Sequence, residues 1–361
     1  MPKEHEQAFH EVGVETLHGR ARFVDRQRLD VDGQRIEADD IVIATGAKPR
    51  PLAIPGSEHV AASAEFLDLD ELPERICFVG GGYVSLEFAH LAAHAGAEAH
   101  ILTRGDRVLE HFDRGLVAEL VEAARGEPIE VYDNSPVREI EVTEDGYRVY
   151  SDGEHPALEH DLVVHGAGRV PEIDDLDLAE ADVDHDEEGL TVDEHLQSPT
   201  NEHVYAAGDA AATDGWPLTP IAAREGSLAA RNVLTHRGQT DQPPATMDYA
   251  GTASVAFTIP PIARVGLTED EAEEAQPEIA VQAGDMSEWF SYAHERASPA
   301  RYKVLTEADS GRIVGAHLLG ANAEETINLF ALAIRQGLRA EELTAVPWAY
   351  PSHGNEVTYM V

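Results

Sequence analysis

The residues best suited to chemistry in this sequence form the run GGGYVS at Gly80–Ser85, which fits the pattern G-x-G-x-x-[SA]. The first glycine of this pattern permits a tight turn, and the second lets the backbone approach a pyrophosphate. The small Ser85 allows a helix to pack closely on a strand. A helix that begins here would offer its N–H groups to phosphates. These residue types predict a dinucleotide-binding turn, with a glycine turn that binds nothing as the alternative.

The residues that follow bear on which dinucleotide is bound. Thr103 ends an apolar segment about 20 residues after Gly80, where an NAD site would have an acid for the ribose 2′-hydroxyl. The sequence has Thr103, Arg104 and Arg107 instead. A guanidinium group is suited to a 2′-phosphate. We therefore expect NADP(H), with NAD(H) as the alternative, and two solvated loop arginines as the structural alternative.

The elements around the turn must bring a helix N-terminus to the ends of two strands. ICFVG at 76–80 reads as a buried strand, 83–95 as a helix with an apolar face, and AHILT at 99–103 as a second buried strand. Strand, turn, helix and strand in this order are typical of a parallel sheet. This context makes the glycine-rich run more specific than an isolated match.

The rest of the chain alternates β-rich and helical segments. Hairpins are expected at 32–33, 145–146 and 309–311, and helices from Asp113 and over 219–234. Two apolar strands end in Ala44–Gly46 and in Gly208-Asp209, where open α/β sheets bind ligands. From about residue 246 the pattern becomes that of a separate α+β domain.

The composition is strongly acidic. Of 361 residues, 68 are Asp or Glu and 26 are Lys or Arg, which gives a formal net charge of −42. Such a surface repels nucleic acid and anionic membranes, so we expect neither as a partner. The acids are spread along folded-looking segments, which favours a salt-adapted protein over an acidic tail. No apolar run approaches ~18 residues and the first residues lack a signal-peptide pattern, so we expect a cytoplasmic protein.

Cysteine and histidine give weaker signals. The one cysteine, Cys77, falls in a buried-strand pattern and is expected to be a small buried hydrophobe. His90 and His94 have the i, i+4 spacing of a chelating pair, but no third ligand is evident in the sequence. We therefore expect a solvent-facing pair and no metal site.

Together these segments resemble the pyridine nucleotide–disulfide oxidoreductases, a family that includes glutathione reductase, dihydrolipoyl dehydrogenase and mercuric reductase. The resemblance covers nearly the whole chain and rests on IVIATGAKPR, ICFVGGGYVSLEFA, GAGRVPE, NEHVYAAGDAA, LTPIAAREG, SVAFTIPPIARVGLT and GRIVGAHLLGANAEETI. It implies an α/β fold of FAD- and NAD(P)-binding, Rossmann-like three-layer domains plus a C-terminal α+β dimerisation domain. The implied domains are a partial FAD-binding domain at 1–72, an NAD(P)-binding domain at 73–193, the remainder of the FAD-binding domain at 194–245, and a dimerisation domain at 246–361.

The resemblance also implies cofactors and the residues that bind them. FAD would be bound by Ala21, Ala44, Thr45, Gly46 and Asp209, with the helix after Thr219 directed at the flavin. NADP(H), or NAD(H), would be bound by Gly80, Gly81, Gly82, Tyr83, Val84, Ser85, Leu86, Glu87, Thr103, Arg104, Arg107 and Gly168. Within this set, Tyr83 would cover the flavin, Glu87 would pair with a lysine beside it, and Gly168 with Arg169 would contact the nicotinamide half.

The sequence also departs from the family. The family's opening FAD-binding strand–GxGxxG–helix unit and its C-x4-C redox pair do not occur in it, so we expect an N-terminally truncated member. Near the C-terminus the family has His-Pro-Thr and an acid five residues after the histidine. Here Tyr350 stands at the histidine position and Asn355 at the acid's, and His353 with Glu356 forms a shifted alternative. Tyr350, His353 and Glu356 are therefore the candidate catalytic residues.

The function that the resemblance implies is that of a glutathione-reductase-like flavoprotein. Hydride would pass from NADPH through FAD to a small disulfide substrate, in a homodimer formed by the C-terminal domain. A dihydrolipoyl dehydrogenase is one alternative, disfavoured by Thr103 and Arg104, and a mercuric reductase is another, disfavoured by the ending VTYMV without a cysteine pair. An alternative of another class is an inactive fragment that binds nucleotide or dimerises but lacks the redox cysteines.

Overall fold

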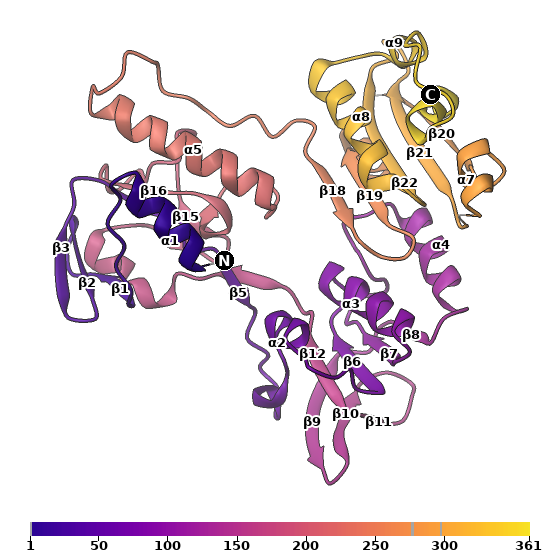
Figure 1. Cartoon of the computed structure of the whole chain (residues 1–361), viewed down its shortest axis with the longest axis horizontal. Helices are drawn as coiled ribbons and strands as arrows, with labels where there is room; N and C mark the ends of the chain where they lie inside the picture. Colours follow the sequence, from indigo (N-terminus) through magenta and orange to yellow (C-terminus); the bar gives the residue numbers. More distant parts are fainter. Residues whose placement is uncertain (1, 276–277, 297) are drawn as a thin grey trace. The chain divides into compact units, whose positions relative to one another are not determined.

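The computed structural model describes residues 2–275, 278–296 and 298–361. The chain divides into two compact units (Figure 1). Unit 1 comprises Met1–Lys48 and Arg169–Tyr249, and unit 2 comprises Pro49–Gly168 and Ala250–Val361. Each unit is thus built from two separate stretches of the sequence. The four domain ranges expected from the sequence remain predictions.

Unit 1 combines short strands with one long helix, α5. Its helices and strands are α1 (Pro2–Glu11), β1 (Ala21–Phe23), β2 (Arg28–Val31), β3 (Gln34–Glu37), β4 (Ile41–Ile43), β14 (His185–Asp186), β15 (Gly189–Thr191), β16 (Val204–Ala206), β17 (Ala211–Ala212) and α5 (Thr219–His236). Strands β5 (Ala47–Pro49) and β13 (Arg169–Pro171) pair where the chain passes between the units.

The core of unit 1 forms around the parallel pair β4 and β16, in which Ile41 lies opposite Val204. Ile41 and Ile43 are buried there together with Phe23 of β1. The expected hairpin at 32–33 is confirmed: β2 and β3 pair across a turn in which Asp32 and Gly33 both have positive φ, at 48° and 92°. This conformation suits a short Asp side chain and a glycine.

The first half of unit 2, residues 49–168, contains a parallel sheet in the order β12-β6-β7-β8. Its helices and strands are α2 (Ser63–Leu67), β6 (Arg75–Val79), α3 (Tyr83–His94), β7 (Glu98–Leu102), α4 (Arg114–Ala124), β8 (Ile129–Tyr132), β9 (Val137–Thr143), β10 (Gly146–Ser151), β11 (Leu158–His160) and β12 (Leu162–His165). The predicted strand–turn–helix–strand unit is therefore confirmed as β6-α3-β7, and the predicted hairpin at 145–146 as β9-β10.

The second half of unit 2, residues 250–361, is a five-stranded antiparallel sheet in the order β18-β19-β22-β21-β20, with α8 across one face (Figure 1). Its helices and strands are β18 (Ala253–Ala256), β19 (Ile262–Gly266), α6 (Glu269–Ala275), β20 (Ile279–Asp285), α7 (Phe290–Glu295), β21 (Arg301–Glu307), β22 (Ile313–Leu319), α8 (Ala323–Gln336), α9 (Ala340–Thr344) and α10 (His353–Glu356). The helix α8 buries Ile327, Phe330 and Ala333 against the sheet at helical spacing.

The two halves of unit 2 share one hydrophobic core. Ala256, Ile262 and Leu319 of the second half are buried in the same cluster as residues of β6, α3, β7 and α4. Burial of apolar side chains on both sides stabilises this junction by roughly 25 cal/mol for each Å² removed from water. The two halves are therefore held as a single packed body.

Two sequence expectations at this core had different outcomes. Cys77 is fully buried in β6, as expected, and burial raises the pKa of its thiol well above the ordinary range. The expectation of a solvent-facing histidine pair was wrong for His90, which is 1% exposed, although His94 is exposed. The reason is that His90 lies on the face of α3 that packs against the second half of unit 2, where the Ile259 N–H donates to its Nδ1.

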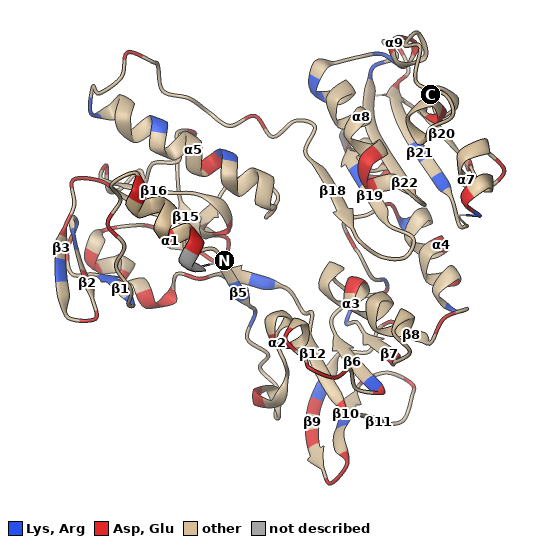
Figure 2. Cartoon of the chain, viewed as in Figure 1, with Lys and Arg blue, Asp and Glu red and all other residues tan. Residues whose placement is uncertain are grey.

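Acidic side chains are distributed over both units rather than gathered in one segment (Figure 2). This distribution disfavours the acidic-tail alternative. Within the described residues, no helix has the length and apolar character required to span a membrane.

Candidate functional site

The glycine-rich turn joins the end of β6 to the first turn of α3. Gly80 has φ 111°, and a Cβ atom on it would collide with the carbonyl oxygen of Gly166. A Cβ atom on Gly81 would lie 2.8 Å from Thr103 Oγ1. Gly82 is the residue that precedes α3, so the N-terminal N–H groups of the helix face the turn. The glycines therefore serve both the backbone conformation and the close approach of neighbouring strand ends.

Ser85 gives the turn its clearest sign of a ligand. Its side chain is fully buried, and its Oγ has no hydrogen-bond partner among the described residues. A Cβ atom on Gly166 would collide with this oxygen, so the strand end and the helix are in close contact here. Buried polar atoms are rarely left without partners. A glycine cradle, a helix N-terminus and an orphaned hydroxyl together fit the pyrophosphate of a dinucleotide.

The residues expected at the ribose lie in the loop after β7. Thr103 is 4% exposed, and its Oγ1 accepts a hydrogen bond from the Gly105 N–H at 3.3 Å. Arg104 is exposed, and its side chain pairs with no other described residue. Arg107 is half-buried and donates to the carbonyl oxygen of Glu110 at 2.8 Å. The Nη1 of Arg107 is also without a partner among the described residues, but it is buried, so Arg104 is the arginine exposed to a ligand.

The first turns of α3 place the remaining expected residues. Tyr83 is half-exposed at the start of the helix, and Leu86 is buried in the core. Val84 is half-buried. Glu87 accepts a hydrogen bond from the Phe257 N–H at 2.9 Å, and burial raises the pKa of its carboxyl although this bond opposes the shift. Gly168 has φ 95°, and its carbonyl oxygen accepts from the Arg50 N–H.

The residues expected to bind FAD lie in unit 1. Ala44–Gly46 and Gly208–Ala210 follow the neighbouring parallel strands β4 and β16, so Asp209 and the Ala44–Gly46 loop come to the same edge. A Cβ atom on Gly208 would lie 3.0 Å from Ala222, so the first turn of α5 lies against this edge. Ala21 is in a separate sheet, where it pairs with Val31. Strand ends beside a helix N-terminus are where open α/β sheets bind nucleotides, so these residues fit part of a FAD site.

A residue that the sequence did not single out holds this edge together. Glu225 of α5 is 1% exposed, and its carboxylate accepts from the Gly208 N–H at 2.8 Å, the Thr213 hydroxyl at 3.0 Å and the Tyr249 hydroxyl at 2.6 Å. It lies within the LTPIAAREG segment, but a single acid in a helix gives no sign in sequence that it is buried.

The candidate catalytic residues lie at the C-terminal end of unit 2. His353 begins α10, and its side chain is 12% exposed between two carboxylates. Its Nε2 lies 3.2 Å from Glu295 Oε1, and its Nδ1 lies 3.9 Å from Glu356 Oε2. Glu356 is buried and also accepts from the Ser291 N–H at 2.8 Å. The structure thus brings His353 and Glu356 together and adds Glu295, which the sequence pattern did not indicate.

Tyr350 lies apart from this arrangement. It is 70% exposed, and its ring is 5.8 Å from that of Phe290. His353 instead has the ring of Tyr292 at 4.5 Å. Neighbouring side chains thus hold His353 in place, whereas the side chain of Tyr350 is mostly exposed.

Comparisons with known proteins match both parts of the chain to one enzyme family. Residues 3–226 match the family model described as pyridine nucleotide-disulphide oxidoreductase, and residues 252–361 match its dimerisation domain. A glutathione reductase of Nostoc sp. is 30% identical over 96% of this chain and 77% of that enzyme. A mercuric reductase of Lysinibacillus sphaericus is 28% identical over 92% of this chain, which spans 60% of that enzyme's length.

The solved structures agree as well. The HOCl-induced flavoprotein disulfide reductase RclA from Escherichia coli superposes with a TM-score of 0.90 at 25% sequence identity, over 99% of this chain and 81% of that one. The family's enzymes use FAD and NAD(P)H. From the nucleotide turn, the strand-end edge of unit 1 and these matches, we conclude that the chain belongs to the pyridine nucleotide-disulphide oxidoreductase family.

Proposed function

We propose that this chain supplies the NADPH-binding and dimer-forming parts of a glutathione-reductase-like enzyme that reduces a small disulfide. The observation that carries the proposal is the turn at Gly80–Ser85, where a buried Ser85 hydroxyl lacks a partner among the described residues beside a helix N-terminus. The exposed Arg104, placed where an NAD site would have an acid, supports NADPH over NADH.

FAD, when bound, would supply the two-electron chemistry between NADPH and the disulfide. The residues of this chain have binding and orienting roles. The turn would bind the pyrophosphate through backbone N–H groups, Arg104 would bind the 2′-phosphate, and Asp209 with the Ala44–Gly46 loop would orient the flavin nucleotide. Cys77 is fully buried, so it is not proposed as a redox residue.

His353 is the residue that we propose to move a proton during thiol–disulfide exchange. Breaking a disulfide releases a thiolate, which leaves more readily when an acid stands ready to protonate it. Glu295 and Glu356 lie beside the two ring nitrogens of His353, 3.2 Å from Nε2 and 3.9 Å from Nδ1, and would orient its ring. Tyr350 is kept as the alternative proton donor, because it occupies the position of the family's histidine.

The proposal is tested in a protein that combines this chain with a redox-active cysteine pair. Turnover with NADPH and with NADH is compared for oxidised glutathione, lipoamide and Hg²⁺. We expect NADPH with a small thiol disulfide to be preferred. Preference for NADH with lipoamide would instead support a dihydrolipoyl dehydrogenase, and preference for Hg²⁺ a mercuric reductase. Absence of both flavin absorbance and turnover would support the inactive alternative.

The proton role is tested in the same protein with His353→Ala and Tyr350→Phe. We expect His353→Ala to lower disulfide turnover about a hundredfold, the scale of general acid–base catalysis, and Tyr350→Phe to leave it nearly unchanged. NADPH oxidation with an artificial acceptor serves as a control, because it bypasses the disulfide step. If neither substitution lowers disulfide turnover, both assignments are wrong.

Two properties of the whole protein are also part of the proposal. The dimerisation-domain match at 252–361 supports a homodimer. The net charge of −42, spread over both units, supports adaptation to high salt, where screening weakens repulsion between like charges.

A further inference from the structure

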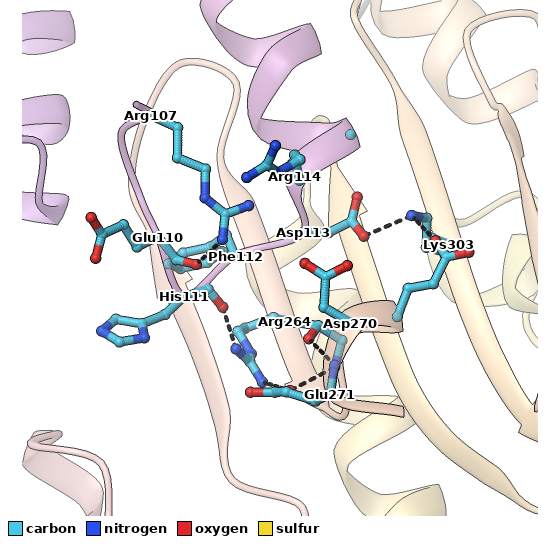
Figure 3. A pocket seen from close by; sticks show the side chains of 13 residues that line it. Arg107, Glu110, His111, Phe112, Asp113, Arg114, Arg264, Asp270, Glu271 and Lys303 are labelled. Atoms are coloured by element: carbon cyan, nitrogen blue, oxygen red, sulfur yellow. Dashed lines mark hydrogen bonds and ion pairs between the residues drawn. The ribbon is translucent and has the colours of Figure 1, made fainter. Parts of the chain in front are cut away.

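A pocket of about 420 Å³ lies between the two halves of unit 2 (Figure 3). One wall is the segment 107–115 of the first half, which follows the loop of Arg104. The other wall comes from β19, β21 and the start of α6 in the second half. Cations are scarce in this protein, yet Arg107, Arg114, Arg264 and Lys303 all line this pocket. The hydrogen-bond and ion-pair partners of Lys303 and Arg264 show what these two residues do in the fold.

Lys303 of β21 joins the two halves. Its Nζ lies 2.7 Å from Asp113 Oδ2 in the first half and 2.7 Å from Glu269 Oε2 in the second (Figure 3). Asp113 is 4% exposed and caps α4 through the Leu116 N–H at 3.1 Å. An ion pair this buried is screened little by salt, and removal of one partner leaves an uncompensated charge.

Arg264 of β19 makes a second connection beside the first. It is 6% exposed and donates to the carbonyl oxygen of His111 in the first half. Its other contacts, to the Gly266 carbonyl at 2.8 Å and Glu271 at 3.2 Å, fix the guanidinium within the second half. Arg264 and Lys303 therefore fix segment 111–113 from the same side.

The residues just before segment 111–113 are hydrogen-bonded to the nucleotide turn. The Leu109 N–H donates to the carbonyl oxygen of Gly81 at 2.8 Å, and the Phe112 N–H donates to the carbonyl oxygen of Leu109 at 2.9 Å. Leu109 has φ 49°, a left-handed conformation that is strained for a leucine and needs support from its surroundings. The side chains of Leu109 and Phe112 are buried in the core that both halves share.

The second half also contacts the other side of the turn. The Phe257 N–H donates to Glu87 at 2.9 Å, and the Ile259 N–H donates to His90 at 3.3 Å, both on α3. Residues of the second half therefore support the turn on two sides, through the loop that follows β7 and through α3.

We propose that the second half of unit 2 positions the nucleotide turn, with Lys303 and Arg264 as positioning residues that hold segment 109–113 against Gly81. Neither residue needs to touch the nucleotide. Their substitution would loosen the Gly81–Leu109 bond, the end of the turn and the adjoining loop that carries Arg104. This inference rests on the proposed nucleotide site, and it adds a dependence of nucleotide affinity on the domain that forms the dimer.

The test compares Lys303→Met with Lys48→Met in the full chain. Lys303→Met removes the two ion pairs of Lys303, and Lys48→Met removes the ion pair of Lys48, which lies 2.6 Å from Asp174 in unit 1. We expect Lys303→Met to raise the dissociation constant for NADPH about threefold to thirtyfold, the range of coupling between residues in contact networks. We expect Lys303→Arg to restore most of the affinity, and Lys48→Met to leave it unchanged. A folded Lys303→Met protein with wild-type affinity would overturn the proposal.

Hydrogen exchange at the Leu109 amide provides a readout that does not depend on nucleotide binding. We expect this amide to exchange at least about threefold faster in Lys303→Met than in the wild type, because its bond to Gly81 opens more often. If the wild type fails to bind NADPH, the proposed function fails, while exchange at Leu109 still tests positioning. If Lys303→Met does not fold, Asp113→Asn replaces it, because asparagine keeps the helix cap and removes the charge. Unchanged exchange at Leu109 in a folded variant contradicts the inference.

Discussion

Arg104 is the side chain that most directly determines which nucleotide the proposed site would prefer. We predict that Arg104→Gln weakens NADPH binding about tenfold or more and leaves NADH binding nearly unchanged, because a charge-assisted hydrogen bond contributes ~1.5–3 kcal/mol and NADH has no 2′-phosphate. Titration of the purified protein with each nucleotide measures both constants.

Arg125→Gln is the matched control for this change. Arg125 is an exposed arginine that follows the last residue of α4 and pairs with Glu122. We expect this variant to bind both nucleotides as the wild type does, since Arg125 lies at the opposite end of α4 from the loop of Arg104. Equal weakening of both nucleotides by Arg104→Gln would show that Arg104 does not contact the 2′-phosphate.

His90 gives the protein a defined acid sensitivity. Burial lowers the pKa of His90 from 6.5 to about 4. Between these values the unfolded chain binds a proton that the folded chain does not. The free energy of unfolding is therefore highest above pH 6.5. It falls by ~1.4 kcal/mol per pH unit as the pH decreases from 6.5 toward 4, because protonation of His90 then stabilises the unfolded chain.

We predict that His90→Gln reduces this dependence, measured as the free energy of unfolding in urea at several pH values between about 7 and about 4. His185→Gln, at an exposed histidine of unit 1, is the matched control. The slope should fall without vanishing, because burial also lowers the pKa of His160, to about 3. A His90→Gln protein with the full wild-type slope would contradict this account.

Residues differ in how well the sequence predicts their surroundings. The glycines of the turn and the cap residue Asp113 of α4 could be predicted, because backbone conformation and local spacing determine them. His90 could not, because its burial depends on a chain segment about 170 residues away. Glu225, Arg264 and Lys303 were missed for the same reason: a charged residue in a local pattern is expected at the surface. Glu295 is exposed, and it was missed because its partner His353 is 58 residues away in the sequence.

At the scale of elements, Glu225 links α5 to the strand-end turn of unit 1. We predict that Glu225→Ala lowers the free energy of unfolding by about 3 kcal/mol, because three partly buried donors, at Gly208, Thr213 and Tyr249, each lose an acceptor. Urea unfolding measures the change. Glu225→Gln keeps one acceptor oxygen and should lose less. Wild-type stability in Glu225→Ala would show that these bonds contribute little.

Regular elements were predicted well where a local pattern was strong. The helices α3 and α5, the hairpins and the β6-α3-β7 unit follow from apolar spacing and turn residues. The helix α1 was not predicted, since its sequence, PKEHEQAFHE, has few apolar residues. The contact between the two halves of unit 2 was not predicted either, because it joins faces whose partners are far apart in the sequence.

At the scale of the whole molecule, the net charge of −42 predicts a dependence on salt. Screening shortens the Debye length from ~10 Å at 0.1 M to ~3 Å at 1 M, which weakens repulsion among surface carboxylates. We expect the melting temperature to rise as KCl increases from about 0.1 M to above about 1 M. Loss of folding or of activity above ~1 M salt would contradict adaptation to salt.

The central claim is that the turn at Gly80–Ser85 binds NADPH, and titration of the purified wild-type chain with NADPH and NADH tests it most directly. The account predicts saturable binding of one nucleotide per chain, with NADPH bound more tightly than NADH. Absence of saturable binding by a folded chain would contradict the claim.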